Sequence, residues 1–160
     1  MKSTWRTMRT IGAILAVAAL AGACVSPEMK RKAAIDGFLQ KTSGDFHNEK
    51  GELFLIPVVA RMVAYDTMYV EKRDASGNVT TARLVSIDYS PKSDKVVQQA
   101  MAFTTEGQWR NLRENPELFT ALLPKDVRPA GSCNITLAED GNSVSYSCSG
   151  SPPETFQRRH

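Results

Sequence analysis

The sequence lacks the motifs that identify common hydrolases and nucleotide-binding enzymes. It contains no Gly-x-Ser-x-Gly and no glycine-rich phosphate loop. The only two histidines are His47 and the terminal His160, and neither is placed to activate a serine or cysteine nucleophile. We therefore assign no catalytic residue, and whether the protein is an enzyme stays open.

Cysteine is also scarce. The chain has three, at positions 24, 133 and 148, and none of them belongs to a Cys-x-x-Cys pair. With two histidines and no such pair, the sequence offers no zinc-binding pattern, so we predict no metal site.

The chain has no excess of charge once its first 23 residues are left out. Its formal net charge is +3, but the first 23 residues hold three of the twenty basic residues and no acidic one. The remaining 137 residues, enough for one domain, carry seventeen charges of each sign. Without a stripe of lysine and arginine there is no electrostatic footprint for nucleic acid, and we predict no such partner.

What the sequence does contain is an export signal. Lys2, Arg6 and Arg9 precede the apolar run Ile11–Ala23, whose thirteen residues are too few to cross a bilayer. The run ends in Leu-Ala-Gly-Ala directly before Cys24, a pattern that resembles bacterial lipoprotein signals. In that family the cysteine is acylated and becomes the new N-terminus. Ordinary secretion with cleavage before position 24 is the alternative.

These signals divide the chain into four parts. We predict a signal peptide over residues 1–23, a tether over 24–32, a single β domain over 33–150 and a C-terminal tail over 151–160. Several acyl chains on Cys24 would anchor the protein stably, since each buried methylene contributes about 0.8 kcal/mol. In that family, Asp directly after the acylated cysteine retains a lipoprotein in the inner membrane. This chain has Val25 at that position and so resembles lipoproteins of the outer membrane. The expected location is therefore the outer membrane, facing the periplasm.

Two short stretches of the sequence predict helices. Ile35, Phe38 and Leu39 share one face of a helix over residues 33–41. A second start signal lies at 115–117, where an N-cap asparagine, a proline and a glutamate precede an apolar run that a further proline ends.

The first clear hairpin lies between residues 66 and 89. Two β-rich runs flank an Asp-Ala-Ser-Gly-Asn turn. If Arg73 lies opposite Val79, then Tyr69 lies opposite Arg83.

This register leaves two arrangements of the hairpin. In one, the core face carries Met68, Val70, Ala82 and Leu84. Glu71 and Arg83 are then a solvated pair that contributes under about 1 kcal/mol. In the other, Tyr69, Glu71 and Arg83 turn inward and line a cavity with polar groups.

The last hairpin predicts a disulfide. Cys133 and Cys148 are equally far from the Asp-Gly pair at 140–141, so a symmetric turn places them opposite each other. In an oxidising compartment the two are expected to bond, which stabilises the domain by about 3 kcal/mol. Ile135 then lies opposite Tyr146, on the same face as the disulfide.

The strands predict a mainly β (α+β) domain. Several antiparallel strands with short turns favour a meander that curls into an up-and-down barrel or half-barrel with short helices. No long helix alternates with strands, which argues against a parallel α/β fold.

The order of the motifs resembles the CpcT/CpeT family of phycobiliprotein lyases. That family has an early Gly-x-Phe-x-Asn, a Tyr-x-Glu strand, a strand around an arginine, and a helix end that leads to Gly-Cys and a second cysteine. The corresponding stretches here are Gly44–Asn48, Tyr69–Glu71, Ala82–Leu84 and Leu122–Cys133, with Cys148 as the second cysteine.

The resemblance implies a lipocalin-like barrel and, in photosynthetic members, attachment of a linear tetrapyrrole to a protein cysteine. The chain departs from the family in three ways. Of an Arg-Gln-Arg strand it keeps only Arg83, Ser132 separates the glycine from the cysteine, and the twelve residues after Cys148 are too few to complete the family's barrel. The resemblance therefore supports the family's fold for this chain more strongly than the family's activity.

From these observations we expect a membrane-anchored periplasmic lipoprotein whose barrel binds a small apolar or tetrapyrrole-like ligand. Tyr69, Glu71 and Arg83 are the expected polar lining. The first alternative is a non-catalytic structural or interaction lipoprotein of the cell envelope with a solid core. The second is a chromophore lyase. The sequence names no protein partner.

Overall fold

The computed structural model describes residues 26–58, 66–103 and 127–160. The predicted signal peptide, the predicted lipidation site Cys24 and the helix expected after residue 115 lie outside these residues. Within them one helix, α1 (Pro27–Thr42), precedes the strands β1 (Gly44–Asn48), β2 (Gly51–Val58), β3 (Asp66–Asp74), β4 (Val79–Ser90), β5 (Lys95–Phe103), β6 (Val127–Leu137), β7 (Ser143–Cys148) and β8 (Glu154–Arg158).

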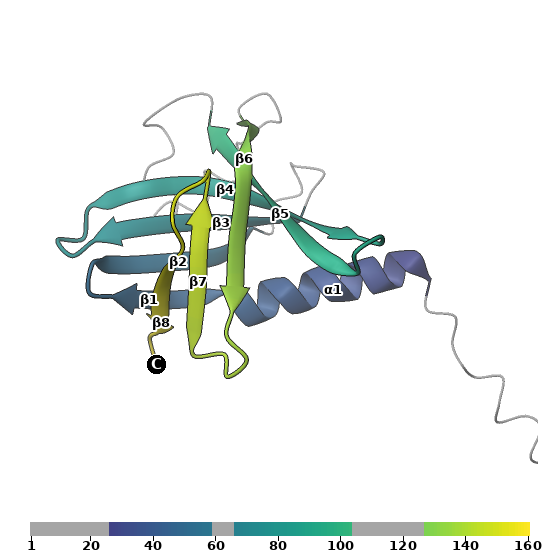
Figure 1. Ribbon diagram of the computed structural model, residues 1–160, viewed down its shortest axis with the longest axis horizontal. Coiled ribbons are helices and arrows are strands. Elements are labelled where there is room, and N and C mark those ends of the chain that lie inside the picture. Colours follow the sequence, from purple (N-terminus) through teal and green to yellow (C-terminus); the bar gives the residue numbers. More distant parts are fainter. Residues whose placement is uncertain (1–25, 59–65, 104–126) are drawn as a thin grey trace, which may run out of the picture.

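The strands form a closed antiparallel barrel (Figure 1). Each strand pairs with the next one in sequence, and β1 pairs with β8 to complete the ring. Closure removes the full-length exposed edges that an open sheet would present, although β5 and β6 pair along only part of their length. The prediction of a mainly β, lipocalin-like barrel is confirmed, and the barrel is closed.

Helix α1 begins earlier than the sequence analysis predicts. The Ser26 side chain accepts a hydrogen bond from the Met29 N–H at 3.2 Å, Pro27 occupies the first turn and Glu28 lies beside it. This is a standard N-cap with a proline and an acid after it. The prediction of an irregular tether is therefore wrong for residues 27–32, which are helical.

One face of α1 packs against an end of the barrel. Ile35 is fully buried and belongs to the same apolar cluster as the side chains inside the barrel. Ala34, Phe38 and Leu39 pack against that cluster, and the helix contacts β2, β4, β5 and β6. In the part of the chain that the structure describes, no helix has the length and apolarity needed to cross a membrane.

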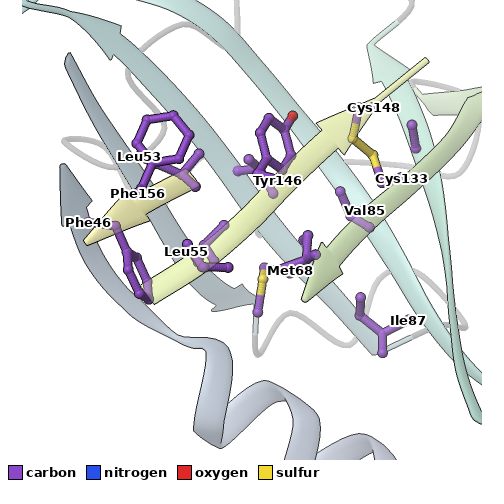
Figure 2. Packing of buried hydrophobic residues seen from close by; sticks show 14 of the residues in the cluster. Phe46, Leu53, Leu55, Met68, Val85, Ile87, Cys133, Tyr146, Cys148 and Phe156 are labelled. Carbon is purple, nitrogen blue, oxygen red and sulfur yellow. A yellow bond between two sulfur atoms is a disulfide. The ribbon is translucent and has the colours of Figure 1, made fainter. Parts of the chain in front are cut away.

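The interior of the barrel is filled by apolar side chains, as expected for eight strands. Figure 2 shows this packing, with both hairpin cysteines at one end of the cluster. The buried residues from the strands include Phe46, Leu53, Leu55, Met68, Val70, Val85, Ile87, Ala100, Ile135, Val144 and Phe156.

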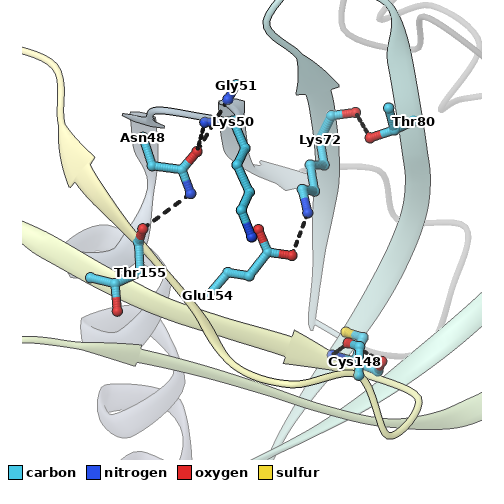
Figure 3. A network of polar contacts seen from close by, with 9 residues as sticks. Asn48, Lys50, Gly51, Lys72, Thr80, Cys148, Glu154 and Thr155 are labelled. Atoms are coloured by element: carbon cyan, nitrogen blue, oxygen red, sulfur yellow. Dashed lines mark hydrogen bonds and ion pairs between the residues drawn. The ribbon is translucent and has the colours of Figure 1, made fainter.

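A β-bulge changes the register of the β3–β4 hairpin. Arg73 pairs with Val79 as predicted, but Lys72 pairs with Thr81, so that Thr80 is an extra residue on β4. The Thr80 hydroxyl donates a hydrogen bond to the Lys72 carbonyl at 3.0 Å (Figure 3). An extra residue of this kind shifts every later pair by one position.

After this shift neither predicted arrangement holds as a whole: Met68 and Val70 are in the core, as the first one predicted, but the partner residues on β4 differ. Val70, rather than Tyr69, lies opposite Arg83. Arg83 therefore shares the inner face with Val70, whereas Tyr69 and Glu71 lie on the outer face. On β4 the apolar residues that enter the core are Val85 and Ile87, and the predicted Ala82 and Leu84 lie on the outer face.

The C-terminal residues complete the barrel. The prediction of a tail is wrong for residues 154–158, which form β8 and pair with both β7 and β1. The twelve residues after Cys148, expected to be too few for the barrel of the CpcT/CpeT family, are enough to close the barrel of this chain. A strand of five residues is enough because Phe156 is fully buried between its neighbours.

The β6–β7 hairpin follows the predicted register. Cys133 lies opposite Cys148 and is bonded to it, and Ile135 lies opposite Tyr146. The disulfide prediction is confirmed.

Candidate functional site

The candidate site is a group of polar side chains inside the barrel, at the end remote from α1. We call it the polar mouth and define it as Lys72, Arg83, Tyr146 and Glu154. The strand pairing places all four on the inner face, because Lys72 pairs with the buried Leu53, Arg83 with Val70, and Tyr146 with both Ile135 and Glu154.

Lys72 and Glu154 form an ion pair across the mouth. The Lys72 Nζ lies 2.5 Å from Glu154 Oε1, and the two side chains are 22% and 29% exposed (Figure 3). The same Nζ lies 5.9 Å from the centroid of the Phe156 ring. Glu154 Oε2 is buried and has no hydrogen-bond partner among the described residues.

Tyr146 carries the most unusual group of the site. The residue is 7% exposed, and its hydroxyl is buried with no hydrogen-bond partner in the described part of the chain. Burial raises the pKa of this hydroxyl; the Arg83 charge opposes that shift and the Glu154 charge adds to it. A buried hydroxyl without a partner costs about 1–3 kcal/mol, so among the described residues this group is an unfilled hydrogen-bonding position.

Most N–H donors of the Arg83 guanidinium have no hydrogen-bond acceptor among the described residues. Within the described residues its guanidinium makes one hydrogen bond, from Nη1 to the Ser149 Oγ at 3.3 Å. A guanidinium has five N–H donors arranged to bind a carboxylate or phosphate. Two cations against one carboxylate give the mouth an excess of positive charge.

The disulfide borders this site. Cys148 is two residues from Tyr146 on β7, and its bond to Cys133 holds β7 against β6. Ser151 closes the following turn, because its Oγ accepts from the Cys148 N–H at 3.2 Å and donates to the Cys148 carbonyl at 2.7 Å. The position of Tyr146 is thus set covalently as well as by the sheet.

The other two predicted site residues form a separate cluster on the outer face. The Tyr69 hydroxyl donates to Glu71 Oε2 and Arg73 Nε donates to Glu71 Oε1, both at 2.6 Å. Glu71 is fully buried, and the Arg73 guanidinium lies 5.4 Å from the centroid of the Phe54 ring. The structure therefore brings Tyr69 and Glu71 together but separates them from Arg83.

Three residues of the polar mouth are absent from the predicted lining. Tyr146 had a usable signal, because the last hairpin already placed it on the face of the disulfide. Lys72 also had a signal, because it alternates with Met68 and Val70 along β3 and so shares their face. Glu154 lies in the segment predicted to be a tail, and no local pattern predicted its position.

A metal centre is not indicated by the described residues. Across residues 26–58, 66–103 and 127–160, no three or more histidine, cysteine, aspartate or glutamate side chains are grouped so that they could hold a metal ion.

Comparison of the chain with protein-family models, with curated proteins and with solved structures finds no match. The resemblance to the CpcT/CpeT family stays a prediction.

Proposed function

We propose that the barrel binds a small amphipathic ligand at the polar mouth. The observation that carries the proposal is the Tyr146 hydroxyl, which is buried inside the barrel without a partner among the described residues. A ligand atom that hydrogen-bonds to it would remove the cost of burying that hydroxyl. The barrel fold supports the proposal, since such barrels hold ligands at their mouths.

The chemistry of the mouth favours an anionic polar group on the ligand. Arg83 and Lys72 supply positive charge, and Tyr146 supplies a neutral donor. Leu53 and Phe156 beside the mouth are fully buried. Because side chains fill the barrel there, the ligand would occupy the mouth and would not reach α1.

A linear tetrapyrrole belongs to this ligand class, because its propionate carboxylates suit an arginine, a lysine and a phenol. We do not propose lyase activity. Both cysteines in the described residues form a disulfide, so neither is a free thiol for attachment.

We also propose that the protein acts as an exported lipoprotein anchored through Cys24 to the outer membrane and facing the periplasm. The lipoprotein-like signal supports this location. So does the disulfide, because such bonds persist in oxidising compartments. Palmitate labelling that disappears in Cys24→Ala tests the anchor.

A second function is a structural or interaction lipoprotein without a ligand. The filled interior favours this alternative, because little space is left below the mouth. The two functions differ in what they expect of Tyr146, which matters for binding only in the first.

The test is a binding titration with biliverdin and with laurate, an aromatic and an aliphatic carboxylate. Tyr146→Phe should weaken binding about fivefold, the value of one hydrogen bond. The same variant should raise the free energy of unfolding by about 1 kcal/mol, since it removes a buried hydroxyl without a partner. Arg83→Gln should also weaken binding.

Two controls are matched to these variants. Tyr89→Phe removes a hydroxyl that donates to Asp94, away from the mouth, and should lower stability without changing binding. Arg128→Gln changes an exposed arginine on β6 and should change neither. The proposal fails if neither carboxylate binds at millimolar concentration, or if Tyr146→Phe and Arg83→Gln bind as the wild type does.

A further inference from the structure

The barrel contains a second feature, an opening between β5 and β6. The two strands pair from Phe103 and Val127 to Gln99 and Ser132, with an irregular register between Gln99 and Met101. Beyond Gln99 no further pair joins the two strands in the described residues. Figure 1 shows β5 leaning away from β6 as it approaches α1. We call this opening the seam and define it by residues 95–98 of β5 and 133–137 of β6.

A side chain takes the place of main-chain pairing in the seam. Gln98 Nε2 donates to the Ile135 carbonyl at 3.1 Å, and Gln98 Oε1 accepts from the Ile135 N–H at 2.8 Å. A primary amide thus makes the two bonds that a residue of an antiparallel strand would exchange with Ile135. Because main-chain groups alternate in direction along a strand, those of Leu137 point the same way.

The seam opens into a groove with a volume of about 760 Å³. Its floor and walls are apolar at Phe38, Val96 and Leu137, which lie on α1, β5 and β6. Lys41 and Lys95 line the same groove, and no ion pair joins either of them to another described residue. Arg158, Glu139 and Asp140 line it too, so basic side chains outnumber acidic ones by three to two. The groove therefore combines main-chain hydrogen-bonding groups, apolar contacts and a small excess of positive charge.

We propose that the seam binds an extended, acidic peptide segment of a partner protein as an added strand. A peptide group of the partner replaces the Gln98 amide on Ile135, and its acidic side chains pair with Lys41 and Lys95. Addition of a strand to a sheet edge is an established mode of peptide recognition, with affinity from main-chain bonds and selectivity from side chains. The seam adjoins the polar mouth, because Ile135 lies opposite Tyr146, but the Ile135 main-chain groups point toward Gln98 on β5. The two proposals are tested by different variants and ligands, so they can fail separately.

The Gln98 amide competes with the partner for Ile135. Removing it should tighten peptide binding about fivefold, because the edge no longer has to exchange one partner for another. A comparison of peptide binding to Gln98→Ala and to the wild type therefore tests whether the peptide binds the Ile135 main-chain groups.

The experiment uses the purified protein and an acetylated, amidated pentapeptide of sequence Glu-Val-Thr-Val-Glu. Its matched control carries N-methyl groups on alternate amides, which removes the donors that pair with a strand edge. Nuclear magnetic resonance should show shifts of the Ile135 and Leu137 amides with the first peptide and none with the second. Gln98→Ala should tighten binding about fivefold, and Lys95→Ala should weaken it.

Three results would overturn the proposal. The first is equal binding of the N-methylated peptide. The second is the absence of amide shifts at Ile135 at millimolar peptide in both the wild type and Gln98→Ala. The third is a shift that depends on protein concentration without any peptide, because this would assign the seam to a second copy of the chain.

Discussion

The guanidinium of Arg158 lies over the ring of Phe46, with its carbon 4.6 Å from the ring centroid. The same group donates hydrogen bonds to three main-chain carbonyls, those of Gly141 at 2.9 Å, Ser43 at 2.9 Å and Lys41 at 2.8 Å. One side chain near the C-terminus thus joins β8 to β1, to the end of α1 and to the β6–β7 turn.

Arg158→Ala should lower the free energy of unfolding by about 2–4 kcal/mol, because it removes three charge-assisted hydrogen bonds and a ring contact. Arg158→Lys should recover less than half, since an ammonium cannot reach three carbonyls in a fixed fork. Urea unfolding measures both. Arg159→Ala is the control: its exposed ion pair with Glu52 should contribute less than about 0.5 kcal/mol. Equal losses at both positions would contradict the role of Arg158.

Two glycines should respond to alanine in opposite directions. Gly51 has a φ of +150°, and a Cβ there would lie 1.9 Å from the Arg73 carbonyl oxygen. Gly51→Ala should therefore cost at least about 2 kcal/mol. Gly37 lies within α1 with nothing within 4 Å of a Cβ, so Gly37→Ala should stabilise the protein by about 0.5–1 kcal/mol. Thermal unfolding compares them, and a stable Gly51→Ala would refute the close approach.

Glu71 should be among the most sensitive positions on the outer face. Glu71→Ala removes a buried carboxylate that accepts bonds from Tyr69 and Arg73, and should lower stability by about 3–5 kcal/mol. Tyr69→Phe removes the hydrogen bond to the Glu71 carboxylate and should cost about 1.5–3 kcal/mol. Chemical denaturation tests this order, and equal losses for the two variants would mean that the carboxylate contributes only through the tyrosine.

Asp74 should make the stability sensitive to acid. Its carboxylate accepts hydrogen bonds in the β3–β4 turn, the strongest from the Asn78 N–H, and these bonds lower its pKa below the ordinary value. The folded state therefore binds a proton less readily than the unfolded state. The resulting stabilisation is present above the unfolded pKa and is lost as the pH falls through the lowered one.

Asp74→Asn should remove this part of the acid dependence when urea midpoints are followed from neutral pH to about pH 2. The control is Asp140→Asn in the β6–β7 turn, where Asp140 Oδ1 accepts a hydrogen bond from the Asn142 N–H. This variant should retain the part of the acid dependence of stability that Asp74 causes in the wild type. Parallel curves for Asp74→Asn and the wild type would show that Asp74 does not contribute.

The disulfide should contribute about 3 kcal/mol, because it restricts the unfolded chain between Cys133 and Cys148. Replacing both cysteines by alanine should lower the free energy of unfolding by that amount under oxidising conditions. Reductant should have a similar effect on the wild type and none on the double variant.

The sequence alone determined the features that depend on neighbours along the chain. Alternating apolar residues and short turns predicted an antiparallel meander, and the Asp-Gly turn at 140–141 predicted the partners of Cys133 and Ile135. These predictions succeeded because the turn is symmetric about Asp140-Gly141: the Ala138 N–H donates to the Ser143 carbonyl and Leu137 pairs with Val144, which keeps the predicted register. The signal at Ser26-Pro27-Glu28 was equally local and would have given the start of α1.

Only the tertiary structure decided which side chains meet inside the barrel. The extra residue at Thr80 turns Arg83 inward and leaves Tyr69 outside, and a bulge of one residue leaves no trace in the hydrophobic period. β8 is stable because Phe156 is buried and Arg158 contacts distant carbonyls, and no local pattern reports such long-range contacts. The polar mouth exists because these two events bring Arg83 and Glu154 to Lys72 and Tyr146.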